Sequence, residues 1–435
     1  MKKYLPLILV ESYLILTLFI FYFGPVQFRI HNEELFIFIF TIYHLSFIFG
    51  YYLFTKTFKF SGIIYNNKLS NRFFYTIFVL GLFSLLKTYQ NLMLTPSIIP
   101  FNIVDEVIRG LAEPGLVYSE RMVKDVYSLG AESSSRLFNI LSIFFSFSKL
   151  LFIFLFLYYW FSLSVFKKFL SILYSCLFLS AGIASGTNSV IFIFFIFFSC
   201  SIIVIIYKKK PKIIKGMLIV LFFLFLIPLG FFGNIMSERG GGFDYFTSTS
   251  PLGDISISVD TPKLDSISSF YLYSLVWLNY YLVQGYYGFS LIIDLDWNWT
   301  YGFGNSDFLQ RQFLMLTDID ISHKTFQYRV TDIWGKTAQW HSFYGQLAND
   351  FGIVGLSILM VALGGLLSRI WLSIIYNNNI YGLALLPIYI IMIIFFPANN
   401  QIFGYIDTFS YFFALLIFWY LQGKTVLLSS QKGKY

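Results

Sequence analysis

Ten apolar stretches divide the chain, and they limit its possible folds more than any other feature. They lie at about 4–23, 35–54, 73–88, 138–165, 169–186, 189–207, 213–232, 352–374, 382–398 and 408–422. A helix needs about 20 residues to cross the hydrocarbon core of a bilayer. Charged residues make up 12% of the 435 residues, too few to cover a soluble protein of this length. We therefore predict an all-α polytopic integral membrane protein with about ten, at most about twelve, transmembrane helices.

The basic residues predict the orientation. If the N-terminus is cytoplasmic, the inside segments carry Lys and Arg at 2–3, 56–72, 167–168, 208–215, 369 and 424–434, with no Asp or Glu among them. Cytoplasmic loops of membrane proteins carry this excess of Lys and Arg. Both termini are then cytoplasmic. The net charge of +8 reflects topology, and we expect no nucleic-acid partner.

Two long loops are expected on the outer, periplasmic face of a single membrane domain that comprises 1–435. The first spans about 89–136, and the second, about 234–350, holds most of the polar residues. Within the second loop, 270–293 is apolar but rich in Tyr. It can be an interfacial helix, a re-entrant pair or an eleventh span, and we favour the interfacial helix.

His341 stands where the second loop meets the eighth apolar stretch. The following "QLANDFGIVG" places Asn349 and Asp350 where they can cap a helix, and Gly352 and Gly355 where they allow close packing. A histidine at this boundary faces water and can exchange a proton near neutral pH. An interfacial polar side chain without a chemical role gives the same pattern, and the residues alone leave both open.

Each arginine in the outer loops can bind two oxygens of a phosphate group at once. Arg239 stands out because it ends the seventh stretch in "SERGGGFDYF", whose glycines let the backbone approach a ligand. Surface ion pairs are the alternative, since Glu238 precedes Arg239 and Glu120 precedes Arg121. The predicted diphosphate-binding set is Arg239, Arg311, Arg136 and Arg329.

Aromatic and polar residues alternate in "DLDWNWTYGFGNSDFLQR", residues 294–311. Aromatic faces can stack on sugar rings while carboxylates and amides bond to hydroxyls. An aromatic belt at the membrane surface is the equal alternative. The predicted glycan-binding residues are Trp297, Trp299, Tyr301, Asp294, Asp296 and Asn305.

The sequence lacks the motifs of nucleotide and metal enzymes. It has no Walker A, HExxH, CxxC or GxSxG pattern, and its inside loops are too short to form a site. We predict chemistry on the outer face, without a metal or a cofactor.

The layout resembles the Wzy-type polymerases of bacterial O-antigen and capsule repeat units, which are related to O-antigen ligases. The resemblance rests on 280–309, on the turn "SGTNS" (185–189) and on "HSFYGQLANDFGIVGLSILM" (341–360). Many relatives have an arginine in that turn, where this chain has Asn188. If the family uses it for the lipid diphosphate, Arg239 or Arg136 must replace it here.

The resemblance implies a metal-independent glycosyltransferase of the GT-C type in the bacterial inner membrane. It would transfer the growing glycan from undecaprenyl diphosphate to a new repeat unit on the same carrier. His341 and Arg239 would be the catalytic residues: His341 would activate the attacking hydroxyl or bond to the diphosphate, and Arg239 would stabilise the leaving group. The implied partners are the lipid-linked oligosaccharide, membrane lipid, a chain-length regulator and a flippase.

Two other functions fit the same layout. An O-antigen ligase would use the same donor and a different acceptor. A flippase or other transporter would need charged residues along its path. The predicted spans contain little beyond Glu11, His44 and Lys149, which favours chemistry at the outer face over passage.

Overall fold

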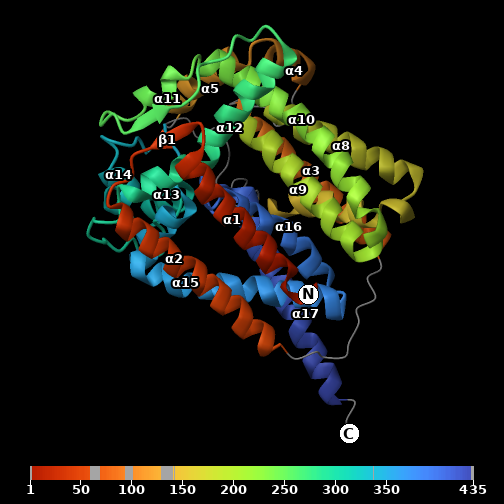
Figure 1. Cartoon of the computed structure of the whole chain (residues 1–435). Coiled ribbons are helices and arrows are strands. Elements are labelled where there is room, and N and C mark those ends of the chain that lie inside the picture. Colours follow the sequence, from red (N-terminus) through yellow and green to blue (C-terminus); the bar gives the residue numbers. More distant parts are fainter. Residues whose placement is uncertain are drawn as a thin grey trace. The chain divides into compact units, whose positions relative to one another are not determined.

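The computed structural model in Figure 1 describes residues 2–58, 69–93, 101–128, 141, 143–336 and 338–432. The chain forms two compact units, each made of segments that are distant in the sequence. The first unit contains Met1–Tyr65, Gly242–Tyr405 and Trp419–Tyr435. The second contains Asn66–Gly241 and Ile406–Phe418. Each is described by itself.

The predicted helical membrane protein is confirmed by eight helices that are long and apolar enough to cross a bilayer. They are Lys2–Phe23, Glu33–Lys56, Asn71–Gln90, Ile143–Ser162, Val165–Ala184, Asn188–Lys209, Pro211–Arg239 and Phe343–Asn377. Two shorter apolar helices, Ile380–Phe395 and Ile406–Gln422, follow. All ten overlap the predicted stretches. How many of them cross the membrane stays a prediction.

The first unit consists of helices around one small sheet. Its helices are α1 (Leu5–Phe23), α2 (Glu33–Lys56), α11 (Asp244–Ser248), α12 (Ile267–Ser290), α13 (Asp307–Thr317), α14 (Phe326–Arg329), α15 (Phe343–Asn377) and α16 (Ile380–Phe395). Strands β1 (Val26–Phe28) and β2 (Ile255–Ile257) pair antiparallel, with Gln27 opposite Ser256. This pairing attaches the short link between α1 and α2 to the second long loop.

The second unit is entirely helical where it is described. It contains α3 (Asn71–Met93), α4 (Ile103–Ala112), α5 (Pro114–Ser128), α7 (Phe147–Tyr159), α8 (Val165–Ala184), α9 (Asn188–Lys209) and α10 (Ile214–Arg239). Short 3₁₀ turns occur in both units: Lys2–Tyr4 precedes α1, and Trp160–Ser162, Pro211–Ile213 and Ser322–Lys324 lie between consecutive helices. Helix α17 (Ile406–Lys432) is divided between the two units at Trp419.

Glycines bring α2 and α15 into close backbone contact. A Cβ at Gly50 would lie 2.0 Å from the carbonyl oxygen of Val361, and one at Gly364 would lie 2.0 Å from that of Phe47. Small residues permit this approach between helices in membranes. The expected close packing through Gly352 and Gly355 is not what holds this pair together. Gly355 has only Phe351, on its own helix, near its Cβ position.

Residues 270–290 lie in one continuous helix, α12, rather than in a re-entrant pair, and 291–293 form the turn that follows it. A capping box between Ser266 and Ser269 begins it. It is not among the helices apolar enough to cross a bilayer. Its second half is buried within the first unit, including Tyr286 and Tyr287, and it forms the surface against which the second long loop packs.

Candidate functional site

Helix α15 contains a break at Gly352, where φ is +68° and ψ is +166°. This left-handed φ is one that residues with a Cβ rarely adopt. The indole of Trp297 covers the glycine, and a Cβ there would lie 3.2 Å from the ring. The predicted span began at 352. α15 thus joins two helical segments: the first begins at Phe343, with Ser342 as its N-cap, and the second follows Gly352, where the predicted span begins.

Asn349 and Asp350 do not cap α15, contrary to expectation, but fix the loop in front of it. Asn349 donates to the carbonyl of Gly304 (2.9 Å) and to Gln327 Oε1 (2.7 Å), and it accepts from the backbone N–H of Phe326 (2.8 Å). All its polar groups point away from the helix axis into the loop. This amide therefore holds together segments 304, 326–327 and 349.

The buried carboxylate of Asp350 accepts hydrogen bonds that hold a turn of the loop in place. It accepts hydrogen bonds from Thr300 Oγ1, from the N–H of Gly304 (3.0 Å) and from Asn305 Nδ2 (2.9 Å). A buried charge costs much free energy unless it is bonded in this way. Asn305, predicted to bind glycan, therefore already uses its Nδ2 in a bond to Asp350. Its Oδ1 is buried without a partner in the described structure.

The other predicted glycan-binding residues lie along the exposed edge of the loop. Trp297, Trp299 and Tyr301 are 48%, 56% and 43% exposed. Trp299 and Tyr301 are neighbours, with ring centroids 4.9 Å apart. Asp294 accepts from Asn32 Nδ2 at 3.0 Å, and Asp296 is exposed. The structure therefore brings the Trp299 and Tyr301 rings together, while Trp297 lies over Gly352 and Asp294 bonds to Asn32.

His341 lies in the interior of the first unit, directly before α15. It is 3% exposed, and its Nε2 is buried without a hydrogen-bond partner among the described residues. It packs on α12, since a Cβ at Gly288 would lie 3.3 Å from His341 Nδ1 and 3.0 Å from the Trp334 ring. Trp334 in turn donates through Nε1 to the carbonyl of Trp340 at 3.0 Å.

Burial lowers the pKa of His341 to about 4, while backbone hydrogen bonding to Gly335 and Trp334 partly opposes this shift. The ring is therefore neutral at pH 7. This corrects the expectation of a solvent-facing histidine that exchanges a proton near neutral pH. Because Nε2 has no partner, we assign the backbone hydrogen bonds to Nδ1–H. That tautomer leaves the lone pair on Nε2.

Lys336 is a nearby cation that the sequence did not single out. Its Nζ lies 3.1 Å from Asp307 Oδ1 and 3.1 Å from Gln310 Oε1. Asp307 and Lys336 both influence the pKa of His341, in opposite directions. An ion pair therefore stands beside the buried ring. Only the position of Lys336, five residues before His341, hinted at this.

The two predicted arginines in the first unit have different environments. Arg329 donates to the backbone carbonyl of Asp296 and lies 5.8 Å from the centre of the Phe326 ring. Arg311 on α13 is exposed, and no partner is found for it in the described ranges. Arg311 is the freer of the two to bind an anion.

Arg239 belongs to the second unit, at the last residue of α10. Its guanidinium lies 3.5 Å from the centre of the Tyr118 ring, and the adjacent Glu238 accepts from the N–H of Gly115 at 2.8 Å. The expected pairing of Glu238 with Arg239 is therefore replaced by a contact to α5. Arg136, the remaining predicted arginine, lies outside the described residues.

The "SGTNS" turn joins α8 to α9 through Gly186, whose φ is +61°. Ser185 and Thr187 bond to each other at 2.6 Å. Asn188 begins α9, and its Oδ1 is buried without a partner in the described structure. Asn188 thus offers a buried amide oxygen at this turn.

A second histidine site escaped the sequence analysis. His31 Nε2 lies 2.7 Å from Asp254 Oδ2, and the same oxygen accepts from Tyr287 OH at 3.1 Å. Burial raises the pKa of Tyr287 to about 12, so the phenol keeps its proton and donates. His31 and Asp254 are 223 residues apart. No local pattern pairs them, and only the β1–β2 pairing brings them together.

No group of three or more His, Cys, Asp or Glu that could hold a metal ion occurs among the residues the structure describes. Comparison with protein-family models, with curated proteins and with solved structures returned no match. The resemblance to Wzy-type polymerases therefore stays a prediction.

Proposed function

We propose that this protein is a Wzy-type glycosyltransferase that polymerises lipid-linked oligosaccharide repeat units at the outer face of a bacterial inner membrane. The observation that carries the proposal is the buried Nε2 of His341, which has no partner in the described structure. A buried polar atom without a hydrogen bond costs about 1–3 kcal/mol, and such an atom calls for an explanation. A hydroxyl group of a bound acceptor would supply the missing bond.

The neutral ring keeps a lone pair on Nε2 that can accept a proton, and the negative charge of a bound diphosphate would raise its low pKa toward the range that general-base catalysis needs. In the proposed reaction, a hydroxyl oxygen at the non-reducing end of the acceptor forms a bond to the donor's anomeric carbon. The bond from that carbon to the diphosphate breaks, and the diphosphate leaves with the electron pair. The hydroxyl proton passes to His341 Nε2. General-base catalysis of this kind contributes on the order of 10²–10⁴-fold.

The leaving diphosphate requires positive charge that strengthens its binding as the bond breaks. In the first unit, Arg311 is exposed and is suited to this role. Lys336, beside His341 in the same unit, is a second source of charge. Arg239, the other predicted catalytic residue, belongs to the second unit, where its guanidinium lies over the Tyr118 ring. Arg→Lys substitutions would show whether the diphosphate needs the two parallel hydrogen bonds of a guanidinium or only its positive charge.

Exposed aromatic rings support binding of the glycan. Trp299 and Tyr301 are adjacent and solvent-accessible, and apolar ring faces of this kind can stack on the faces of sugars. Trp297 is held by its Nε1 bond to the Asn349 carbonyl at 2.8 Å. A glycan on these rings would lie on the loop whose other end leads to His341.

Burial of His341 means that a substrate reaches Nε2 only after the surrounding segment opens. Many enzymes assemble the reacting groups through such a loop movement. The donor and acceptor are both lipid-linked in this proposal, and their chains would enter from the bilayer. A flippase would supply them, and a chain-length regulator would limit the product.

The deciding experiment is the surface glycan profile of cells in which the gene is deleted. A polymerase predicts that lipid A core carries a single repeat unit and that the ladder of longer chains is lost. If polymer instead accumulates on undecaprenyl diphosphate, the protein is a ligase. If single units accumulate on the cytoplasmic side, it is a flippase, and the proposed role of His341 fails.

A further inference from the structure

Two tight turns of the second unit lie at one surface of the membrane. Leu163 and Ser164 alone join the apolar helices of α7 and α8, and Lys210 alone joins those of α9 and α10. Links this short between helices that can cross a bilayer lie at the membrane surface. Lys209 Nζ, at the second turn, donates to the carbonyl of Tyr158, at the first turn, at 2.6 Å. The two turns therefore share one surface.

Three lysine ammonium groups gather at these turns, each over an aromatic ring. They are Lys209 Nζ, 3.5 Å from the centre of the Tyr158 ring, Lys168 Nζ, 5.7 Å from that of Trp160, and Lys210 Nζ, 4.9 Å from that of Phe161. Aromatic faces attract cations at such distances. Lys168 belongs to α8, whereas Lys209 and Lys210 lie at the end of α9, so packing brings them together. We call Lys168, Lys209 and Lys210 the lysine cluster.

No carboxylate among the described residues pairs with the lysine cluster. The sequence contains no Asp or Glu from residue 133 to residue 237, and the ion pairs of the described chain do not include these lysines. Asp407 on α17 is a carboxylate that reaches α7, but it pairs with Lys149, about 15 Å along the helix from Tyr159. Lys212 and Lys215 follow the second turn and add to the positive charge. The surface at these turns is therefore strongly positive.

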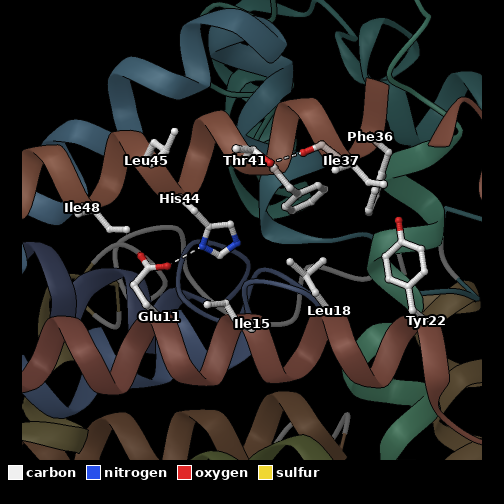
Figure 2. A pocket seen from close by; sticks show the side chains of 11 residues that line it. Glu11, Ile15, Leu18, Tyr22, Phe36, Ile37, Thr41, His44, Leu45 and Ile48 are labelled. Atoms are coloured by element: carbon white, nitrogen blue, oxygen red, sulfur yellow. Dashed lines mark hydrogen bonds and ion pairs between the residues drawn. The ribbon is translucent and has the colours of Figure 1, made fainter. Parts of the chain in front are cut away.

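The first unit shows the opposite arrangement of ionisable residues in membrane helices. Figure 2 shows Glu11 on α1 opposite His44 on α2, with Glu11 Oε2 2.7 Å from His44 Nδ1. Both side chains are mostly buried, among aliphatic residues such as Ile15. There the polar partner is part of the protein, as the cost of an unpaired buried charge requires. Lys209 and Lys210 are instead exposed at the end of their helix, where the membrane can supply the counter-charge.

Apolar side chains beside the lysine cluster restrict the kind of anion that binds there. Phe161, Val165 and Phe166 are 86%, 83% and 60% exposed, and they lie at the turn that joins α7 to α8. Exposed apolar side chains next to lysines are typical of surfaces that contact lipid. A nucleotide or a nucleic acid would leave these side chains in water. A phospholipid places phosphate at the ammonium groups and hydrocarbon on the apolar side chains.

We propose that the lysine cluster binds the headgroup of an anionic phospholipid, whose acyl chains lie on Phe161, Val165 and Phe166. Ammonium groups donate charge-assisted hydrogen bonds to phosphate oxygens, and lysine clusters at the ends of membrane helices attract anionic lipids. The bound lipid would join α8 to α9, since it contacts Lys168 on one helix and Lys209 on the other. The inference does not rest on glycan transfer.

Native mass spectrometry of the purified, delipidated full-length protein tests this proposal. The probes are dioleoyl phosphatidylglycerol, which is anionic, and dioleoyl phosphatidylcholine, which has the same acyl chains but no net charge. The measured quantity is the dissociation constant of the first bound lipid. We expect the wild type to bind phosphatidylglycerol at least about tenfold more tightly, because each lysine near an anionic headgroup contributes about fivefold.

Triple variants separate this site from positive charge in general. Lys168→Gln, Lys209→Gln and Lys210→Gln together should lower the preference for phosphatidylglycerol at least about fivefold. The same three positions changed to Arg keep the charge and should keep the preference. The matched control combines Lys2→Gln, Lys3→Gln and Lys56→Gln in the first unit, where Lys3 and Lys56 also lie over tyrosine rings. It should leave the preference unchanged.

Three results would overturn the proposal. Equal affinity of the wild type for both lipids would show that the lysine cluster does not select an anionic headgroup, and this comparison needs no variant. An equal loss of preference in the Gln variant of the cluster and in the control would mean that the net charge of the protein attracts the lipid. Displacement of phosphatidylglycerol by an equal concentration of glycerol 3-phosphate would mean that the site binds free phosphate.

Discussion

His341 and His31 lie against the same turn of α12 and show opposite environments. His341 contacts Gly288, is 3% exposed and has no partner for Nε2 in the described structure. The His31 side chain is 41% exposed and is paired with Asp254, which Tyr287 also holds. His341 Nε2 is buried without a hydrogen bond in the described structure, and a ligand could supply one. The His31 and Asp254 side chains already bond to each other, and their bond joins two loops. We therefore propose a chemical role for His341 and a tethering role for His31.

The largest expected effect is on activity. His341→Ala should reduce polymer formation on the order of 10²–10⁴-fold, the range of a lost general base. The assay is the length distribution of glycan made from a synthetic polyprenyl-diphosphate repeat unit by purified protein. His31→Ala is the control and should change the rate by less than about tenfold. A reversed order of the two variants would refute the comparison.

The second effect is a loss of stability in acid. The folded pKa of His341, about 4, lies below the ordinary value of about 6.5. Between pH 6.5 and pH 4, the His341 ring therefore binds a proton in the unfolded chain but not in the folded protein. The free energy of unfolding has its full value above pH 6.5 and falls as the pH drops toward 4. At pH 5 the loss is about 2 kcal/mol.

Thermal unfolding in detergent at pH 7.5 and pH 5 measures this loss. His341→Gln removes the titrating group, so its melting temperature should depend less on pH than that of the wild type. The same pH dependence in wild type and variant would mean that His341 is not held neutral by burial.

A smaller effect is expected at Gly288, which separates the two histidines. A Cβ there would lie 3.0 Å from Trp334 and 3.3 Å from His341 Nδ1. Gly288→Ala should destabilise the protein by about 1–3 kcal/mol, as overpacked sites do, and should also lower activity by displacing His341. Gly355→Ala is the control, because only Phe351 is near, at 3.6 Å. Equal melting temperatures of the two variants would contradict this packing.

The smallest effect is expected for the exposed pair. Asp254→Asn removes the charge beside His31, and because the His31 side chain is 41% exposed, its coupling to the buried Asp254 should be about 1 kcal/mol. A double-mutant cycle with His31→Gln in thermal unfolding measures the coupling. A coupling well above 1 kcal/mol, or a loss of activity as large as that of His341→Ala, would show that His31 does more than tether the loops.

Much of the fold follows from the sequence because a bilayer imposes one strong local rule. Apolar stretches must form helices to satisfy their backbone groups in hydrocarbon, so ten apolar helices could be located from composition alone. The residue at which α15 starts could not be located in this way. A first helical segment, capped by Ser342, precedes the predicted start, and the break at Gly352 separates it from the segment that the sequence predicted.

The sequence singled out the candidate residues, but it could not predict their environment. His341 is distinctive in the sequence because it precedes an apolar stretch, and the exposed rings of Trp299 and Tyr301 follow from a loop rich in aromatics. Only the tertiary structure buries His341 against α12 and so makes it neutral. Its protonation depends on desolvation by residues such as Gly288 and Trp334, which are more than five residues away in the chain.

The sequence by itself determined the helices, because hydrophobicity acts over about 20 neighbouring residues. Only the tertiary structure determined which polar side chains bond to each other. Glu11 meets His44 across 33 residues, and His31 meets Asp254 across 223. Hydrogen bonds and ion pairs act over about 3 Å between specific atoms, and which atoms come that close depends on how the helices pack.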